Sequence, residues 1–292
     1  MLSFVLRNLR FLVLVLLLTL LSACSAVRLS YDNADWLLAR MAESYVDLDR
    51  DQARALKAEL AQFHDWHRSE ELPRYAELLD EAARRLDQGL SREDVLWAVA
   101  SVRVRSRTLS QHAAEDMIPL LLTLNDDQLV ELEQRFAREN RKFYAAKLPK
   151  DPEAAVEVRA EWLCDRLVDW TGALTGPQRS RVEQLVRAFP EVPALRLASR
   201  KQRQAQFLRL LRQRDDHAAR AQLVTFLSDP EASRIARYQE VMVAWEGQFV
   251  DLLLDLDRSL TSRQRATAVE RLRRYAAEFR GLSSVSIAES GA

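Results

Sequence analysis

Two histidines and a glutamate at helical spacing form the pattern in this chain that most resembles a metal site. His64, His67 and Glu71 form the string His-x-x-His-x-x-x-Glu. In a helix, spacings of three and four residues place all three side chains on one face. Imidazole and carboxylate groups arranged in this way can hold zinc, nickel or copper. The alternative interpretation is a solvated polar face that caps the helix or contacts Arg68.

Sequence motifs for catalysis are absent. The chain has no nucleophile elbow, no phosphate-binding glycine loop and no His-Glu-x-x-His string. Paired acids such as Asp126-Asp127 and Asp215-Asp216 stand where helix starts favour negative charge. We therefore predict no catalytic residue, no cofactor and a non-enzymatic function, with a degraded or unrecognised hydrolase as a further alternative.

A run of basic residues without any acid extends from Val192 to Arg214. Leucines and Phe207 alternate with the basic residues at helical spacing, which predicts a basic amphipathic helix. Such a helix can contact anionic lipid head groups, peptidoglycan carboxylates or an acidic partner. The alternative is a core helix whose basic face is neutralised by neighbouring acids. The candidate surface-binding residues are Arg200, Lys201, Arg203, Arg209 and Arg212.

The first 24 residues have the layout of a secretory signal. Arg7 and Arg10 precede an apolar run from Phe11 to Leu21, and Leu21-Ser22-Ala23-Cys24 follows. The apolar run is about half the roughly 20 residues that span a bilayer. A cysteine at the cleavage position resembles the signals of bacterial lipoproteins. That resemblance implies cleavage before Cys24, lipidation of its thiol and acylation of the new amino terminus, whereas the alternative is an ordinary transmembrane anchor.

The residues after Cys24 predict a body held close to a membrane. By the usual sorting rule for lipoproteins, Ser25 rather than aspartate implies the periplasmic face of the outer membrane. Only residues 25–30 separate Cys24 from the first helical pattern, and six extended residues reach about 20 Å. Residues 1–23 contain two of the 43 basic residues and none of the 43 acidic ones, so the mature chain carries 41 minus 43, a net charge of minus two. This balance argues against nucleic acid as a partner.

Composition predicts an all-α fold. The 292 residues include only six glycines and eight prolines, and apolar residues recur at intervals of three and four. The short strand-like alternation at Val102–Arg105 is interpreted as helical. Cys164 and the six tryptophans are expected to be buried. Helices are predicted at 33–47, 50–70, 73–88, 92–122, 126–147, 152–172, 177–188, 194–213, 217–227, 230–257 and 262–281.

The predicted helix starts share the spacing of a capping box, with a cap residue three positions before a glutamine or an acid. Asp49, Asn125, Thr175 and Thr261 each precede a glutamine in this way, and Ser91 with Asp94 and Ser228 with Glu231 are variants. Residues 35–52 also align without gaps on residues 161–178, with Trp36 meeting Trp162 and Gln52 meeting Gln178. A further ten inserted residues bring Gln128 onto Gln264. We interpret this as an internal duplication, although biased helical composition could produce it by chance.

Two resemblances to known families accompany these motifs. The segments Tyr31–Trp36, Tyr45–Leu48, Trp66–Arg68 and Leu72–Tyr75, following the signal, resemble an uncharacterised family of proteobacterial lipoproteins over nearly the whole chain. The Leu-Thr-x-x-Gln strings at Leu174 and Leu260 are similar to the repeated motif of the Spy and CpxP periplasmic stress proteins. That second resemblance implies a chaperone, stress-signalling or metal-responsive role.

These observations together predict an all-α, multi-helix bundle made of two related halves. The expected organisation is a signal peptide at 1–23, a lipidated tether at 24–32, helical halves at 33–148 and 159–281, and a disordered tail at 282–292. The expected role is a non-enzymatic envelope interaction or chaperone-like protein, anchored through Cys24, with envelope proteins, anionic lipid or peptidoglycan as partners. A periplasmic metal-binding or metal-sensing protein is the alternative.

Overall fold

The structure, a computed structural model, describes residue 28, residues 31–148 and residues 151–289, and within them every regular element is a helix. Cys24 and the predicted signal peptide lie outside the described residues. The helices are α2 (Ala34–Glu43), α3 (Arg50–Trp66), η1 (His67–Glu71), α4 (Leu72–Gln88), α5 (Arg92–Leu121), α6 (Asp126–Lys147), α7 (Pro152–Thr171), α8 (Gly176–Arg187), α9 (Pro193–Arg212), α10 (His217–Ser228), α11 (Ala236–Ser259) and α12 (Ser262–Glu289).

Capping boxes begin the helices where the sequence predicted them. At α3, the Asp49 carboxylate accepts from the backbone N–H of Gln52, and the Gln52 side chain accepts from the Asp49 N–H. The same reciprocal pattern starts α5, α6 and α8, and the Thr261 and Gln264 bonds repeat it at α12. Because each box satisfies backbone donors that a helix start leaves free, these boundaries are encoded locally.

The predicted helix start at Ser228 was wrong. Ser228 is instead the last residue of α10, and α11 begins only at Ala236. The Asp229 carboxylate accepts hydrogen bonds from the N–H groups of Glu231 and Ala232, which forms a short turn rather than the first turn of a helix.

A π-helical turn joins α3 to α4 where the sequence predicted a break before Pro73. The backbone N–H of Leu72 bonds to the His67 carbonyl, five residues earlier. Proline has no N–H, and its ring clashes with the carbonyl four residues before it. The wider π turn at His67–Glu71 absorbs this clash, so the chain stays helical from Arg50 to Gln88.

Two other boundaries differ from the predicted ones. α2 ends at Glu43 rather than at residue 47, and Tyr45 and Val46 pack into a core instead. The tail predicted as disordered from residue 282 is helical through Glu289. Leu282 is only 4% exposed, so α12 is packed on the body as far as this residue.

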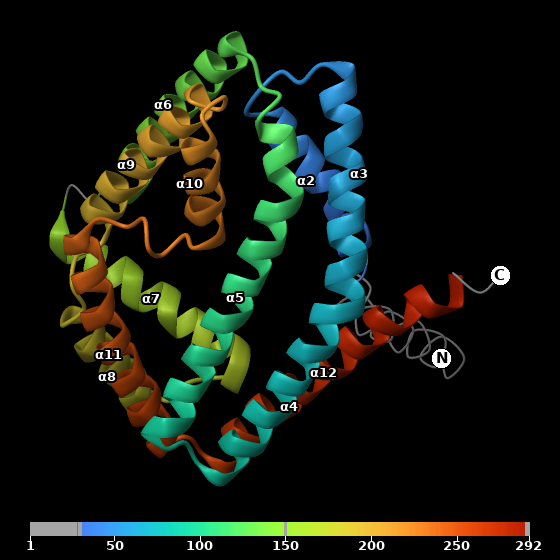
Figure 1. Cartoon of the computed structure of the whole chain (residues 1–292). Coiled ribbons are helices and arrows are strands. Elements are labelled where there is room, and N and C mark those ends of the chain that lie inside the picture. Colours follow the sequence, from blue (N-terminus) through green and yellow to red (C-terminus); the bar gives the residue numbers. More distant parts are fainter. Residues whose placement is uncertain (1–27, 29–30, 149–150, 290–292) are drawn as a thin grey trace, which may run out of the picture.

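The helices form a ring-like frame in which the first and second parts of the chain interlock (Figure 1). The last helix, α12, lies along α4, whereas α6 lies along α9. The opposite sides of the frame are α3 and the pair α8 and α11, and α5 crosses the frame in contact with α3, α10 and α11. The predicted halves therefore pack as partners rather than as separate bodies.

Apolar burial is divided among separate clusters instead of one central core. The largest cluster joins the α2–α3 turn, α6, α9 and α10, and the next joins α7, α8 and α11. Smaller clusters lie between α2, α3 and α5 and between α5 and α11. Cys164, as predicted, is buried, and burial raises the pKa of its thiol. Because the apolar cores are separate, some helix faces between them are not covered by a neighbouring helix.

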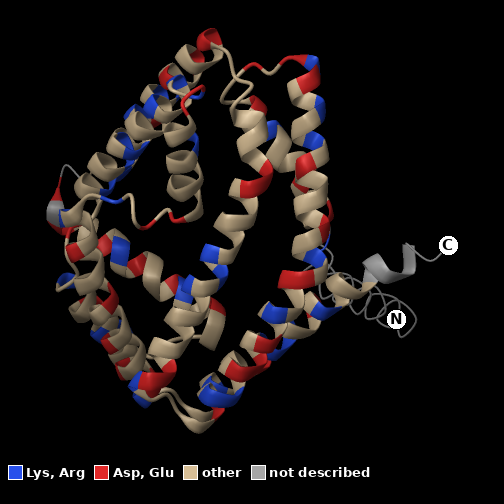
Figure 2. Ribbon diagram, in the orientation of Figure 1, with Lys and Arg blue, Asp and Glu red and all other residues tan. Residues whose placement is uncertain are grey.

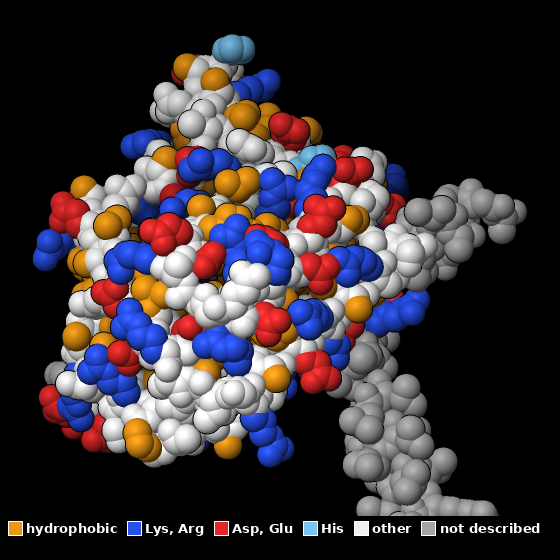
Figure 3. Space-filling model, turned by 90° about the horizontal axis from the view of Figure 1, so that it is seen from below, with side chains coloured by type: hydrophobic (Ala, Val, Ile, Leu, Met, Phe, Trp, Pro, Cys, Tyr) orange, Lys and Arg blue, Asp and Glu red, His pale blue; other side chains and the backbone are white. Residues whose placement is uncertain are grey.

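Residues of both charge signs are mixed along the helices (Figure 2). The space-filling view from below shows the same mixture across that face (Figure 3). Ion pairs such as Arg92–Asp251 and Arg103–Glu246 link α5 to α11. No helix among the described residues is sufficiently long and apolar to cross a membrane.

Candidate functional site

An apolar cavity of about 590 Å³ lies between α7, α8, α11 and α12. The α4–α5 corner covers one side of it through Leu86 and Leu90. Most lining side chains are leucine or aromatic: Trp162, Leu163, Leu167, Trp170, Val186, Phe189, Trp245, Phe249, Leu253, Leu256, Leu260, Ala268 and Leu272. Its volume falls within the range of about 300–1,000 Å³ that is common for small-molecule sites.

Three tryptophans dominate the cavity wall. Trp162 and Trp170 are 62% and 39% exposed, so their indole rings connect the cavity with solvent. Trp245 is deeper, stacked on Phe249 with ring centroids 5.1 Å apart and set edge-on to Phe189 at 5.6 Å. The wall is thus rigid and aromatic inside and accessible at its tryptophan edge.

The charged side chains and the Thr171 hydroxyl on the cavity wall have partners within the protein. Arg159 pairs with Glu191 at 2.5 Å, and Arg166 pairs with Asp169 at 2.9 Å. The Thr171 hydroxyl donates to the Leu167 carbonyl. Asp257, which is 6% exposed, accepts from Arg265 at 2.7 Å. Apart from the indole N–H groups of its tryptophans, the cavity therefore offers mainly apolar contact, which favours an apolar ligand.

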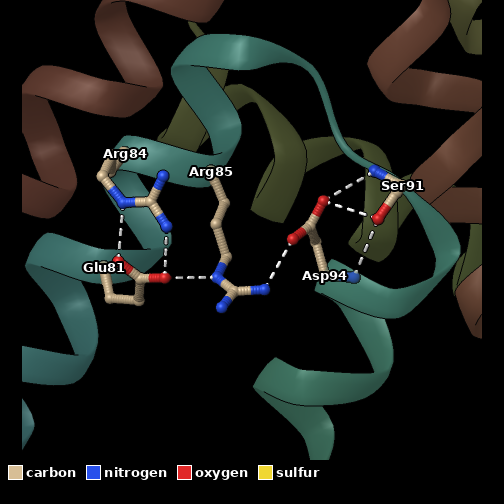
Figure 4. Close-up of polar contacts among 5 residues, drawn as sticks. All are labelled: Glu81, Arg84, Arg85, Ser91 and Asp94. Carbon is tan, nitrogen blue, oxygen red and sulfur yellow. Dashed lines mark hydrogen bonds and ion pairs between the residues drawn. The ribbon is translucent and has the colours of Figure 1, made fainter.

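The corner that covers the cavity is fixed by polar contacts (Figure 4). The Arg85 guanidinium bridges Glu81 on α4 and Asp94 on α5, at 2.6 Å to each carboxylate, and Asp94 caps α5 with Ser91. The guanidinium groups of Arg84 and Arg85 lower the pKa of Glu81 to about 2.

A second set of bonds clamps this corner to the α11–α12 turn. The Leu90 N–H donates to Asp257, and Arg265 donates to the Leu86 carbonyl. Leu86 and Leu90 are thereby held over the cavity by a buried carboxylate and an arginine from the opposite end of the chain.

Two buried glutamines hold α7 and α8 against α11 and α12 at the end of the cavity. Gln178 and Gln264, 4% and 6% exposed, donate to each other's side-chain oxygens at 3.0 and 2.9 Å. Gln178 also donates to the Ser259 carbonyl and Gln264 to the Ala173 carbonyl. Each glutamine side chain thus connects the start of its own helix to the turn that precedes the partner glutamine's helix. These bonds hold the four helices together at this end of the cavity. We call this contact the second glutamine junction.

The same contact occurs once more in the chain. Gln52 and Gln128 donate to each other's side-chain oxygens, and Gln52 donates to the Thr123 carbonyl and Gln128 to the Asp47 carbonyl. This first glutamine junction holds the α2–α3 turn against the α5–α6 turn. Its donors and acceptors match those of the second junction. Gln52 corresponds to Gln178 at an offset of 126 residues, and Gln128 corresponds to Gln264 at an offset of 136.

In the structure, the residues of the His-x-x-His-x-x-x-Glu string contact other side chains of the protein. The His67 ring accepts from or donates to the Tyr31 hydroxyl at 2.8 Å, and Tyr31 also contacts the His64 ring. Glu71 is fully buried and pairs with Arg74 and Arg105. Among the residues that the structure describes, no three His, Cys, Asp or Glu side chains are placed to hold a metal ion.

The basic helix is α9, and its predicted residues do not form one surface. Arg200 and Arg203 line a cavity with Arg196, and Arg234 from another part of the chain joins them there. Lys201 lines a neighbouring cavity, Arg209 is exposed, and Arg212 pairs with Glu133 at 2.5 Å.

The expectation that all six tryptophans are buried was wrong. Trp36, Trp162 and Trp170 are exposed, and Trp66, Trp97 and Trp245 are partly buried. Trp162, Arg166 and Trp170 recur at intervals of four on α7, which is a helical stripe that the sequence alone does not distinguish from core. The cavity was missed because its other walls come from four further elements.

Comparisons with known proteins give a family and no activity. The model of a family of unknown function (DUF6279) matches residues 44–239, more than half of the chain. No curated protein and no solved structure matches. On the strength of the matched segment, the chain belongs to this family of unknown function.

Proposed function

We propose that this protein is a membrane-anchored, non-enzymatic envelope protein that takes up an acyl chain or similar apolar group in the tryptophan-edged cavity. The observation that carries the proposal is a 590 Å³ cavity with an apolar wall, partnered polar groups and two exposed tryptophans at its edge. An apolar ligand gains by leaving water for such a wall, by about 25 cal/mol per Å² of apolar surface buried.

The small number of free polar groups on the cavity wall favours an acyl chain over a polypeptide. A peptide segment in this cavity would bury backbone N–H and C=O groups, and each group left without a partner costs roughly 1–3 kcal/mol. An acyl chain has no such groups. Arg159 and Arg166 stand at the wall near the exposed tryptophans, where their charges can face the polar end of the ligand.

The proposed address is the periplasmic face of the outer membrane, with the protein held by lipid on Cys24. The signal layout supports this, and the last two residues of the predicted tether are docked on the folded body. Tyr31 bonds to His67, and Asp32 pairs with Arg68 at 2.8 Å. Because Tyr31 is seven residues from Cys24, an anchored chain would hold the η1 region close to its membrane.

We further infer that the chain arose by duplication of a helical unit. The two glutamine junctions support this. Gln52 corresponds to Gln178 at an offset of 126 residues, Gln128 corresponds to Gln264 at an offset of 136, and the side chains of both pairs form the same hydrogen bonds. The Leu-Thr-x-x-Gln strings are similar to those of Spy and CpxP. In each string the threonine and the glutamine cap the start of a helix, and the glutamine also pairs with the glutamine of the other string. Other members of the family should retain both glutamine pairs, and members with unrelated residues at one junction would contradict the inference.

The cavity is tested by in-cell photo-crosslinking from a diazirine-bearing residue placed at Trp162, with captured species identified by mass spectrometry. The matched control is the same residue at Trp36, which has a similar exposure of 58% but lines none of the described cavities. Acyl-lipid adducts at position 162 and none at position 36 are expected. Polypeptide adducts at 162, or equal adducts at both positions, would rule out acyl-chain uptake.

The anchor is tested by Cys24→Ala. This variant should lose acylation and leave the membrane fraction, since the lipid is the proposed attachment. Metabolic labelling with an alkynyl fatty acid and membrane fractionation measure both effects. Unchanged labelling and fractionation would refute the lipoprotein assignment.

A further inference from the structure

A second cavity, of about 480 Å³, is lined by four arginines from two elements. Arg196, Arg200 and Arg203 come from successive turns of α9, and Arg234 comes from the loop before α11. We call this the arginine pocket. Phenylalanines from α6, α9 and α10 form its apolar wall, so it joins positive charge with aromatic surface.

Most of this charge is not neutralised by nearby acids. Arg234 pairs with Glu231 at 3.1 Å. Glu139 lies near Arg200 but pairs with Arg135 and Lys142. Within the described part of the chain, no carboxylate lies within ion-pair distance of Arg196, Arg200 or Arg203. The pocket thus has three guanidinium groups without an acidic partner, whereas Arg212 and Arg214, at the other end of the same basic run, are both paired.

Arg203 is the central group of the arginine pocket. Its guanidinium carbon lies 5.4 Å from the centre of the Phe226 ring, and its buried Nε has no hydrogen-bond partner among the described residues. Burial, and then the charge of Arg234, lower the pKa of Arg203. A cation that is partly desolvated and faces another cation is stabilised by a bound anion.

We propose that the arginine pocket binds a phosphate group carried on an apolar or aromatic body. Guanidinium groups bind phosphate and carboxylate through paired N–H donors. A phosphate monoester carries about −1.5 to −2 charges at pH 7, which matches several unpaired arginines better than the single charge of a carboxylate. Phe226 and Phe207 supply the surface for the attached body. This site is separate from the apolar cavity, and neither proposal depends on the other.

The test uses the full chain, purified in a non-ionic detergent, with calorimetric titration and thermal unfolding at constant ionic strength. The probes are inorganic phosphate, phenyl phosphate and dihexanoyl phosphatidic acid, a lipid whose phosphate is also a monoester. Saturable binding should raise the unfolding temperature. Phenyl phosphate should bind more tightly than inorganic phosphate, because its ring adds aromatic contact. Tighter binding of phosphatidic acid than of phenyl phosphate would identify a lipid head group as the source, and the reverse would identify a soluble phosphate ester.

Arg203→Gln and Arg196→Gln should each weaken the binding of phenyl phosphate at least tenfold. Arg209→Gln is the matched control, because Arg209 is an exposed residue of the same helix outside the pocket. It should change affinity less than twofold. Two pocket variants guard against a folding defect in one, and thermal unfolding without ligand verifies that each is folded. The proposal is overturned by the absence of saturable binding, or by an equal loss in Arg209→Gln.

Discussion

The two glutamine junctions are alike in their hydrogen bonds and different in what surrounds them. At the first, Val46, Leu124 and Leu129 are buried in a cluster with side chains of α9 and α10 and line none of the described cavities. At the second, the face of α7 that carries Trp162 and Leu163 borders the open cavity. The same glutamine junction can therefore lie beside a packed apolar cluster or beside a cavity, depending on which helices pack against it.

The helices that follow the junctions differ as well. In the first part of the chain, α3 runs through the π turn into α4 without interruption. In the second, α8 ends at Arg187, and α9 begins with Pro193, which stands 126 residues after His67. The break moves α9 away from α8, and α9 instead pairs with α6. Pro73 is thus accommodated by a π turn within a continuous helix, whereas Pro193, at the position that corresponds to His67, starts a separate helix.

The largest expected contrast is between apolar truncations at the two junctions. Leu129→Ala should lower the free energy of unfolding by about 2–5 kcal/mol, because Leu129 is 1% exposed within a packed apolar cluster and lines none of the described cavities. Leu163→Ala should cost only about 1 kcal/mol, since Leu163 is partly buried and already borders the cavity. Urea unfolding measures both. Equal losses would mean that the cavity wall is packed as tightly as the core.

Loss of either glutamine pair should have a similar effect at both junctions. Gln128→Ala and Gln264→Ala should each lower the free energy of unfolding by about 1–3 kcal/mol, because each leaves buried donors and acceptors unpaired. Double variants with Gln52→Ala and Gln178→Ala should cost less than the sum of the single ones. Losses that differ by more than about 2 kcal/mol between junctions would break the proposed equivalence.

The burial of His67 in the π turn should make the free energy of unfolding depend on pH. Burial lowers the pKa of His67 below the usual value of about 6.5 for histidine, so the unfolded chain binds the proton more readily than the folded one. The free energy of unfolding should then fall as pH falls through about 6.5 towards the lower folded pKa. His67→Phe, which keeps an aromatic ring, should show a shallower fall in urea unfolding between pH 7.5 and 5.5. A fall as steep as in the parent protein would show that other groups cause it.

The smallest expected effect is on stability at the two equivalent tryptophans. Trp36→Ala and Trp162→Ala should each change the free energy of unfolding by less than about 0.5 kcal/mol, because both rings are mostly exposed. Only Trp162→Ala should reduce acyl-lipid capture from a crosslinker at position 170. A large stability loss in Trp162→Ala would assign that ring to the core rather than to a ligand site.

Much of the helical structure was predictable from the sequence. The starts of α3, α5, α6, α8 and α12 follow from cap residues and their partners three positions later, which act within one turn. The burial of Cys164 and the helical state of Val102–Arg105 were also predicted correctly. The predicted start at Ser228 failed because Asp229 forms a competing turn, a choice that the capping pattern does not resolve.

The candidate sites were less predictable. Arg200 and Arg203 were identified from charge, but Arg234 was not, because it lies in a separate loop that only the tertiary fold places beside α9. Trp162 and Trp170 were predicted as core, since a stripe of large apolar residues indicates burial whether or not a neighbouring helix covers it.

The sequence by itself determined that the chain forms helices and where most of them begin, because caps and apolar periodicity act over a few residues. Only the tertiary structure decided that α12 lies along α4 and α6 along α9, and that one glutamine junction is packed while the other borders a cavity. A cavity is the space left between helices from distant parts of the chain. Its existence depends on how their surfaces fit, which no local pattern specifies.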